Sequence, residues 1–163
     1  MPKKLLIHTV DKNIEVRTQC AEIQHPETSV RTPEMQEFFD QLIEAMIRYN
    51  GIGIAAPQVG HCVRICVIHK EYTETPDHLI LINPRIVSLS ERTFRLEQGC
   101  LSVPGTYGPV VRPAKIRVKA YTRNGTPIDI KAKGMYAQVL QHEIDHLDGI
   151  LFIDKAEYVD SKA

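Results

Sequence analysis

One segment near the C-terminal end constrains the fold of this chain more than any other. From residue 135 to residue 147, apolar side chains cover most of the surface that an α-helix would present. At 100° per residue, the only polar strip of this helix consists of Gln138, Gln141 and Asp145. A helix that is apolar on nearly all sides is expected to be buried, so the rest of the chain must fold around it.

The same helix carries two histidines and a glutamate with metal-site spacing. His142 and His146 are four residues apart, and their rings therefore point to the same side of the helix. Glu143 leans toward that side, and burying these three polar groups without a partner would cost free energy. A bound metal ion is the partner that this spacing favours. The pattern predicts a hydrolase in which a metal-activated water attacks a carbonyl group and Glu143 handles the protons.

The residues downstream of His146 do not offer a suitable third metal ligand. A catalytic zinc-like centre has three protein ligands and one open position. The residues after His146 match the metzincin protease pattern until its third histidine, where this chain has Phe152, which cannot bind metal. The downstream carboxylates Asp154, Glu157 and Asp160 are too close to the helix to match a glutamate from a separate, later helix. The third ligand is therefore expected upstream.

Cys100 is the upstream candidate. It follows Gly99, and a Pro-Gly pair at 104–105 ends its segment, so we expect a loop in which the backbone approaches a neighbour closely. A thiolate binds zinc or ferrous iron well. The alternative is a small buried thiol, and that interpretation suits the cysteines in a predicted strand or a polar stretch, which are Cys20, Cys62 and Cys66.

Three segments taken together resemble one known family. Residues 51–60 read Gly-Ile-Gly-Ile-Ala-Ala-Pro-Gln-Val-Gly, residues 99–102 read Gly-Cys-Leu-Ser, and residues 141–149 read Gln-His-Glu-Ile-Asp-His-Leu-Asp-Gly. In order and separation they resemble the three defining motifs of the peptide deformylases, and weaker similarity covers most of the chain after about residue 33. The resemblance implies an enzyme that removes the N-formyl group from the N-terminal methionine of newly made polypeptides and releases formate.

The resemblance also implies a metal centre. By position, Cys100, His142 and His146 correspond to the metal ligands, and Glu143 corresponds to the general base and acid. One divalent metal ion per chain is implied, with ferrous iron as the native metal and zinc, nickel or cobalt able to occupy the site. The ligand types are compatible with all of these metals.

Substrate-binding residues are implied in the same way. Gln58 and the backbone N–H of Leu101 correspond to the groups that hold the formyl oxygen, and Gly53 to the residue whose backbone binds substrate beside the metal. The pocket for the methionine side chain should be apolar, with Ile52 and Val139 as candidate walls. For both residues, simple core packing is the alternative.

The chain departs from the family pattern next to the cysteine. The family usually has a glutamate directly before the Gly-Cys pair, whereas this chain has Gln98 there and Glu97 one residue earlier. If that glutamate normally pairs with an arginine, the pair is lost, shifted to Glu97, or replaced by a neutral hydrogen bond. Arg112 is the first partner to examine. Because Gln98 would act behind the ligands, metal binding and rate are expected to be tuned rather than abolished.

Secondary-structure patterns predict an α+β fold with antiparallel sheets packed around the buried C-terminal helix. A helix is expected to start at Thr32-Pro33 and to stop at Asn50-Gly51. The predicted strands are 62–69, 79–88, 115–122 and 127–132, and the last two are joined by a hairpin at Asn124-Gly125. Residues 1–163 are expected to form a single catalytic domain.

Composition limits the partners and the location. With 20 basic and 20 acidic residues, no broad electrostatic field argues for DNA or for an anionic membrane. The start of the chain lacks a secretory or organelle leader pattern, so the cytoplasm is the expected location. The expected partners are N-formyl-Met nascent peptides and, transiently, the ribosome, with the protein a monomer. Only about ten residues follow Phe152, so we expect no stable docking through a C-terminal helix.

Two other functions stay open at this point. The first is a metallohydrolase that acts on another N-acyl amine. The second is a non-catalytic, metal-binding relative associated with the ribosome. Glu143 and Gln58 argue against the second, because metal binding alone needs neither residue.

Overall fold

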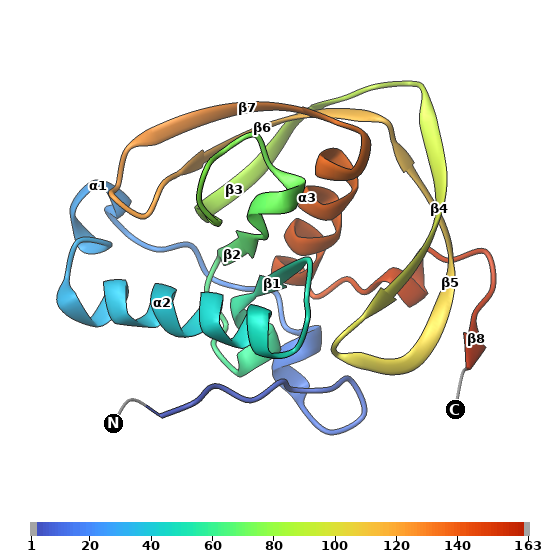
Figure 1. Ribbon diagram of the computed structural model, residues 1–163, viewed down its shortest axis with the longest axis horizontal. Coiled ribbons are helices and arrows are strands. Elements are labelled where there is room, and N and C mark those ends of the chain that lie inside the picture. The colour runs from blue at the N-terminus through green and yellow to red at the C-terminus, as the bar shows by residue number, and fades with distance from the viewer. Residues whose placement is uncertain (1–2, 162–163) are drawn as a thin grey trace.

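The computed structural model describes residues 3–161, which form two antiparallel sheets on either side of helix α3, Gly134–Leu147 (Figure 1). The larger sheet has the order β1-β2-β3-β6-β7, and the smaller has the order β4-β5-β8. The strands are β1 Gly53–Ala55, β2 Ile65–Ile68, β3 Leu79–Leu89, β4 Thr93–Cys100, β5 Val103–Pro113, β6 Lys115–Tyr121, β7 Pro127–Lys133 and β8 Asp160–Ser161. The predicted α+β architecture around the C-terminal helix is confirmed.

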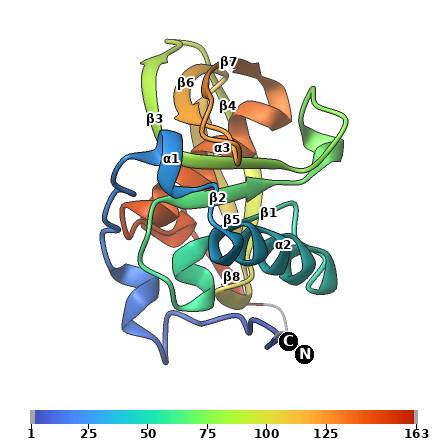
Figure 2. The same ribbon diagram turned by 90° about the vertical axis from the view of Figure 1, so that its left-hand side faces the viewer.

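Strand β2 of the larger sheet is covered on both faces. Its alternate residues divide between two apolar clusters: Cys66 packs with α3, and Ile65 and Val67 pack with the long helix α2, Pro33–Arg48. Figure 2 shows α2 on the side of β1, β2 and β3 that faces away from α3. The strand predicted at 62–69 is present, but it begins at Ile65, because Val63 pairs with Ala21 of the N-terminal segment instead of joining the sheet.

Helix α2 begins and ends where its sequence signals predict. The Thr32 side chain accepts a hydrogen bond from the Met35 N–H, and Pro33 occupies the first turn. Asn50 takes the left-handed conformation after the last turn. The short helices are α1 Pro26–Ser29 and the 3₁₀ helices η1 Ile14–Arg17, η2 Ala56–Val59, η3 Lys70–Tyr72 and η4 Phe152–Asp154.

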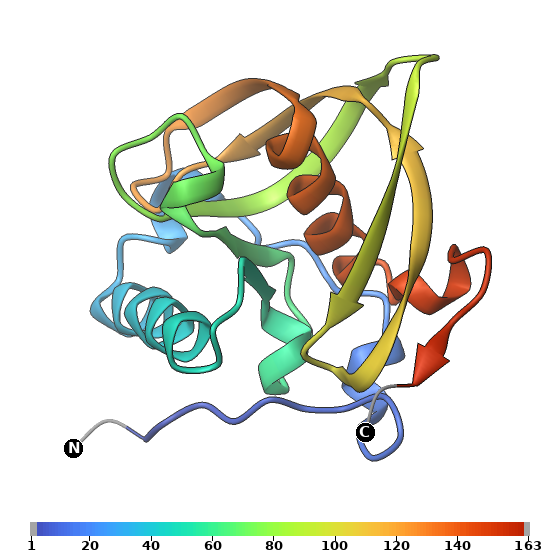
Figure 3. The same ribbon diagram turned by 45° about the vertical axis from the view of Figure 1, so that its right-hand side comes forward.

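The expected loop around Cys100 is instead the tip of a long hairpin. Cys100 is the last residue of β4, the turn consists of residues 101 and 102, and Pro104 and Gly105 lie inside β5. Figure 3 shows this hairpin lying along α3. The sequence pattern missed both strands because β-propensity reflects side-chain packing, and much of the outer side of this hairpin is polar and exposed.

The polar strip of α3 faces the hairpin. The side-chain amides of Gln138 and Gln141 donate to the Pro113 carbonyl at 3.2 and 2.9 Å, and Asp145 pairs with Arg112 at 2.7 Å. The apolar sides of α3 pack into the cluster under the larger sheet. The helix is therefore fixed between the two sheets by apolar contacts on one side and by hydrogen bonds on the other. Of the helices in residues 3–161, none has the length and apolar character needed to cross a membrane.

Candidate active site

Three candidate metal ligands meet between the hairpin tip and α3. The Sγ of Cys100 lies 3.2 Å from Nε2 of His146, which lies 3.2 Å from Nε2 of His142. All three donor atoms fall within 4.8 Å of one another. Two ligands held at about 2.0–2.3 Å from one tetrahedral metal ion are themselves separated by roughly 3–4 Å, so this spacing suits a shared ion.

The protonation chemistry of these donors also fits a metal ion. Burial lowers the pKa of His142 to about 3, with Arg112 adding to the effect, and it lowers the pKa of His146 well below its ordinary value. Both imidazoles are therefore neutral and can ligate. Burial raises the pKa of the Cys100 thiol to about 12, so a thiolate here requires a cation to stabilise it. The donor set and its spacing thus fit zinc or ferrous iron.

Glu143 lies beside these donors with an oxygen left for a ligand. It is 3% exposed, and its Oε2 has no hydrogen-bond partner among the described residues. Burial raises its pKa to about 8, and Arg112 partly opposes that shift. Gly53 packs against it, since a Cβ at this position would lie 2.9 Å from Oε1 of Glu143. A buried carboxylate of this kind can exchange a proton near neutral pH.

Gln58 is held with its amide group directed into the site. It lies in η2, and its Oε1 accepts from the Ala55 N–H at 2.9 Å. Its Nε2 therefore points toward Sγ of Cys100 at 3.6 Å and Oγ of Ser102 at 3.3 Å. Leu101, in the turn that follows Cys100, also lines the pocket. Sequence reasoning missed Ser102, although it lies in the Gly-Cys-Leu-Ser motif.

Gln98 forms a neutral hydrogen bond to a buried arginine. Its Oε1 accepts from Nε and Nη2 of Arg112 at 3.3 and 3.2 Å and lies 3.4 Å from Nδ1 of His142. Arg112 is 2% exposed and has its countercharge in Asp145, which also pairs with Lys155 at 3.0 Å. Of the three outcomes foreseen for the missing glutamate, the structure contains the neutral hydrogen bond.

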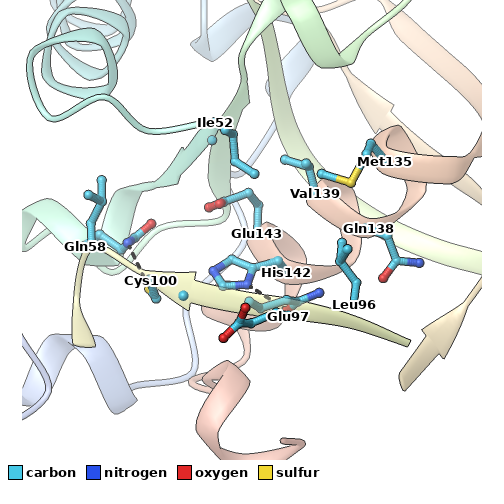
Figure 4. A pocket seen from close by; sticks show the side chains of 14 residues that line it. Ile52, Gln58, Leu96, Glu97, Cys100, Met135, Gln138, Val139, His142 and Glu143 are labelled. Atoms are coloured by element: carbon cyan, nitrogen blue, oxygen red, sulfur yellow. Dashed lines mark hydrogen bonds between the residues drawn. The ribbon is translucent and has the colours of Figure 1, made fainter. Parts of the chain in front are cut away.

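The donors open into a pocket of about 150 Å³. Figure 4 shows a polar end with Gln58 and Cys100 and an apolar end with Leu96, Met135 and Val139. Pockets for drug-sized ligands are usually about 300–1,000 Å³, so this one suits a single side chain. Ile52, 41% exposed, lies at its rim, whereas Val139, 2% exposed, belongs to both the pocket and the core.

Some lining residues were not foreseen in the sequence. Leu96 lies in the unexpected strand β4, and its position two residues before Gln98 places it on the same face of the hairpin. Met135 and Gln138 extend the row of Val139 and His142 along α3, and this helical spacing is the signal that would have identified them.

The residues after α3 do not contribute ligands among the described groups. Phe152 is buried, and its ring stacks beside His142 with the ring centres 6.4 Å apart. Asp154 pairs with Arg17, and Glu157 pairs with Arg95. Phe152, which occupies the position of the third metzincin histidine, therefore packs as a buried apolar side chain next to His142.

Comparison with known proteins places this chain in a family. The polypeptide deformylase family model matches residues 5–162. The chain belongs to the polypeptide deformylase family. It is therefore a hydrolase with a metal-dependent site. The peptide deformylase of Thermodesulfovibrio yellowstonii is 49% identical over 123 residues, which cover 75% of this chain and 74% of that protein.

Solved deformylase structures have the same fold. The peptide deformylase of Thermotoga maritima has a TM-score of 0.86 at 29% identity, covering 96% of this chain and 100% of that one. The peptide deformylase of Synechococcus elongatus, crystallised in complex with actinonin, has a TM-score of 0.84 at 34% identity. The match covers 97% of this chain and 84% of that chain. The deformylase match thus extends over both sheets and α3, and all three motif segments lie within it.

Proposed function

We propose that this chain removes the N-formyl group from the N-terminal methionine of newly made polypeptides, with Glu143 as the residue that moves protons. The observation that carries this proposal is the unpartnered carboxylate oxygen of Glu143 beside three converging metal donors at the floor of an apolar pocket. Metal binding alone would not need this carboxylate. Family membership supports the same reaction.

Cys100, His142 and His146 would hold one divalent metal ion, natively ferrous iron, with zinc, nickel or cobalt as substitutes. Such an ion, when bound, polarises a carbonyl oxygen and lowers the pKa of water. The neutral imidazoles and the thiolate that these residues supply leave the ion with residual positive charge, which favours this chemistry.

Glu143, in its carboxylate form, accepts a proton from the attacking water, because its Oε2 is unpartnered beside the metal donors and burial raises its pKa toward the neutral range. The water oxygen adds to the formyl carbon, and the bond between that carbon and the methionine nitrogen then breaks. Glu143 delivers the same proton to the departing nitrogen. The products are formate and the free amino terminus.

The Gln58 amide and the Leu101 N–H would hold the formyl oxygen while negative charge develops on it. Gln58 is suited to this role because its Oε1 is fixed by the Ala55 N–H, which leaves Nε2 as the donor. The backbone of Gly53, next to Glu143, would bind the substrate chain.

Ile52 and Val139 would contact the methionine side chain. They lie at the rim and on the wall of the pocket, together with Leu96 and Met135. An unbranched thioether fills such an apolar space well. The pocket volume of about 150 Å³ agrees with one side chain as the recognised group.

For the wider setting, we propose that residues 1–163 act as a single catalytic domain, a monomer in the cytoplasm that meets nascent chains during transient contact with the ribosome. Analytical ultracentrifugation of the metal-loaded protein tests the monomer, and a stable dimer at micromolar concentration would refute it.

The reaction is tested with matched formyl-Met and acetyl-Met peptides and with iron-loaded protein prepared without oxygen. We expect formate release from the first peptide and negligible acetate from the second. A preference for the acetyl peptide would indicate another N-acyl hydrolase. If the protein releases no formate although it binds metal as tightly as its Glu143→Ala variant, the non-catalytic interpretation is correct.

A further inference from the structure

The outer face of the larger sheet concentrates positive charge. Along β6, Ile116, Val118 and Ala120 pack into the core, and the residues between them point outward. The same alternation continues in β7. The exposed cations on this face are Arg85, Lys115, Arg117, Lys119, Lys131 and Lys133. In the views of Figures 1 and 3, β6 and β7 form the outer boundary of the molecule, with no described segment over them.

Like charges stand directly opposite one another on this face. In the register of the sheet, Lys115 pairs with Lys133, and Arg117 pairs with Lys131. Arg85 pairs with Lys119 on the other side of β6. Directly opposed like charges destabilise a sheet, so three such pairs in neighbouring strands oppose folding unless an anion compensates them.

The described acidic groups on this face compensate only part of the charge. Asp129 pairs with Arg117 at 2.6 Å, and its pKa is lowered, first by the Arg117 hydrogen bond and further by the nearby lysines. Glu74 lines a shallow groove of about 400 Å³ whose other charged residues are Lys115, Arg117, Lys131 and Lys133. Because the whole chain is neutral, the excess of cations here means an acidic excess elsewhere. The expectation of no DNA partner rested on the overall charge of the chain, which does not show how charge is distributed over the surface.

We propose that this basic sheet face, defined by the six cations named above, binds the phosphate backbone of double-stranded RNA. Rows of cations on rigid strands, about 6.8 Å apart along a strand and 4.8 Å between strands, provide repeated phosphate contacts. Duplex RNA is recognised mostly through its shape, its phosphates and its 2′-hydroxyls, and such contacts need no base-reading side chains.

Other anionic partners fit this face less well. Single-stranded RNA is usually bound through exposed aromatic rings on which bases stack. The aromatic residue in the outward row of β6, Tyr121, is partly buried and packs against the core, so its ring is a poor stacking platform. Anionic membranes are usually bound by cations together with inserting apolar groups. The exposed Leu89 of β3 lines the groove beside four of the cations, but β6 and β7 carry no exposed large apolar side chain, so few apolar groups are available for insertion.

The basic sheet face adjoins the pocket. Lys133 ends β7, and Met135, two residues later, lines the pocket. RNA bound here would therefore lie beside the pocket rim. The binding itself does not depend on the proposed deformylation, since none of the six cations belongs to the catalytic centre.

The test measures fluorescence anisotropy of a labelled RNA duplex of about 16 base pairs with metal-loaded protein over a salt series. The face variant replaces Lys115, Lys119 and Lys131 with Gln. The matched control replaces the exposed Lys4, Lys12 and Lys70 with Gln, and therefore removes the same charge elsewhere. Both variants should keep the formate-release rate of the unmodified chain. The control should keep its melting temperature, whereas relief of the three like-charge pairs should leave that of the face variant equal or higher.

For about four neutralised phosphates, the Kd of the unmodified chain should rise about 100-fold between about 50 and 200 mM salt. The face variant should bind at least about 10-fold more weakly at low salt, with a salt slope reduced by about 3. The control should stay within about twofold. Equal weakening of both variants, or no duplex binding below about 100 µM, would overturn the proposal. So would binding to phosphatidylserine vesicles in place of RNA.

Discussion

Arg112 and Gln98 are joined through a single acceptor, the Gln98 amide oxygen, which accepts from two nitrogens of the guanidinium at 3.2 and 3.3 Å. The same oxygen lies 3.4 Å from Nδ1 of His142, so a neutral group stands between a buried cation and a candidate metal ligand. Asp145 supplies the countercharge of Arg112 from the other side. Lys155 also pairs with Asp145. The four side chains of Gln98, Arg112, Asp145 and Lys155 therefore carry a net charge of +1.

Gln98→Glu should therefore stabilise the protein. A carboxylate at this position would neutralise the unbalanced charge and turn two neutral-acceptor hydrogen bonds into an ion pair with Arg112. Hydrogen bonds between charged groups are worth about 1 kcal/mol more than neutral ones, which corresponds to a rise of about 2–4 °C in Tm for a chain of this length. Thermal and urea unfolding of the two metal-loaded proteins measure the change.

Gln98→Leu is the matched control for that substitution. It has a similar size and removes the acceptor, so two nitrogens of the buried Arg112 lose their partner, at a cost of about 1–3 kcal/mol. If the Glu variant were as unstable as the Leu variant, desolvation of the new carboxylate would outweigh its pairing, and the charge argument would be wrong.

Glu143→Gln and Cys100→Ser should separate turnover from metal retention. The Gln variant keeps the three donors and loses proton transfer, so formate release should fall about 10²–10⁴-fold at unchanged metal content. The Ser variant replaces a thiolate by a weak ligand and should lose metal on dialysis. Metal analysis and formate release on the same samples measure both effects. Full turnover in the Gln variant would remove Glu143 from its proposed role.

Gly53→Ala should impair catalysis by displacing Glu143. The new Cβ would lie 2.9 Å from both Cγ and Oε1 of Glu143, a separation that forces the carboxylate to move. A displacement of about 1 Å at a reacting group can cost about 10²-fold in rate. We expect a loss of that order in kcat/KM with formyl-Met peptides and unchanged metal content, because neither atom belongs to a ligand. An unaltered rate would show that the Glu143 position is not critical.

Asp154→Asn should weaken the protein in a pH-dependent way. Asp154 accepts from Arg17 and from the Leu151 N–H, and these contacts hold its pKa below the ordinary value although burial opposes them. A lowered folded-state pKa gives stability that is present above the unfolded-state pKa and is lost as the pH falls through the folded-state value. The Asn variant should be about 0.5–1 kcal/mol less stable at pH 7. The difference should begin to shrink at about pH 4, near the unfolded-state pKa, and should vanish below the lowered folded-state pKa. Urea midpoints at several pH values measure this, and a constant difference would contradict the assignment.

Local features of the sequence were sufficient for the elements that depend on near neighbours. The spacing of His142 and His146 places both rings on one side of α3 whatever surrounds the helix. The Thr32 cap and the Asn50 stop bound α2, and strict alternation along β6 puts its cations on one face. Each of these outcomes follows from backbone geometry within a few residues.

The tertiary structure decided which residues, distant in sequence, come into contact with these elements. Cys100 meets His146 only because the β4–β5 hairpin folds along α3, and that hairpin was not evident because its strands are stabilised by packing against distant residues. Similarly, Arg112 stands opposite Phe94 in the register of the hairpin and reaches Gln98 four residues further along β4. The amide of Gln58 is directed into the site because the Ala55 N–H holds its oxygen. The sequence by itself determined the helix and its chemistry, whereas contacts between distant residues determined the complete centre.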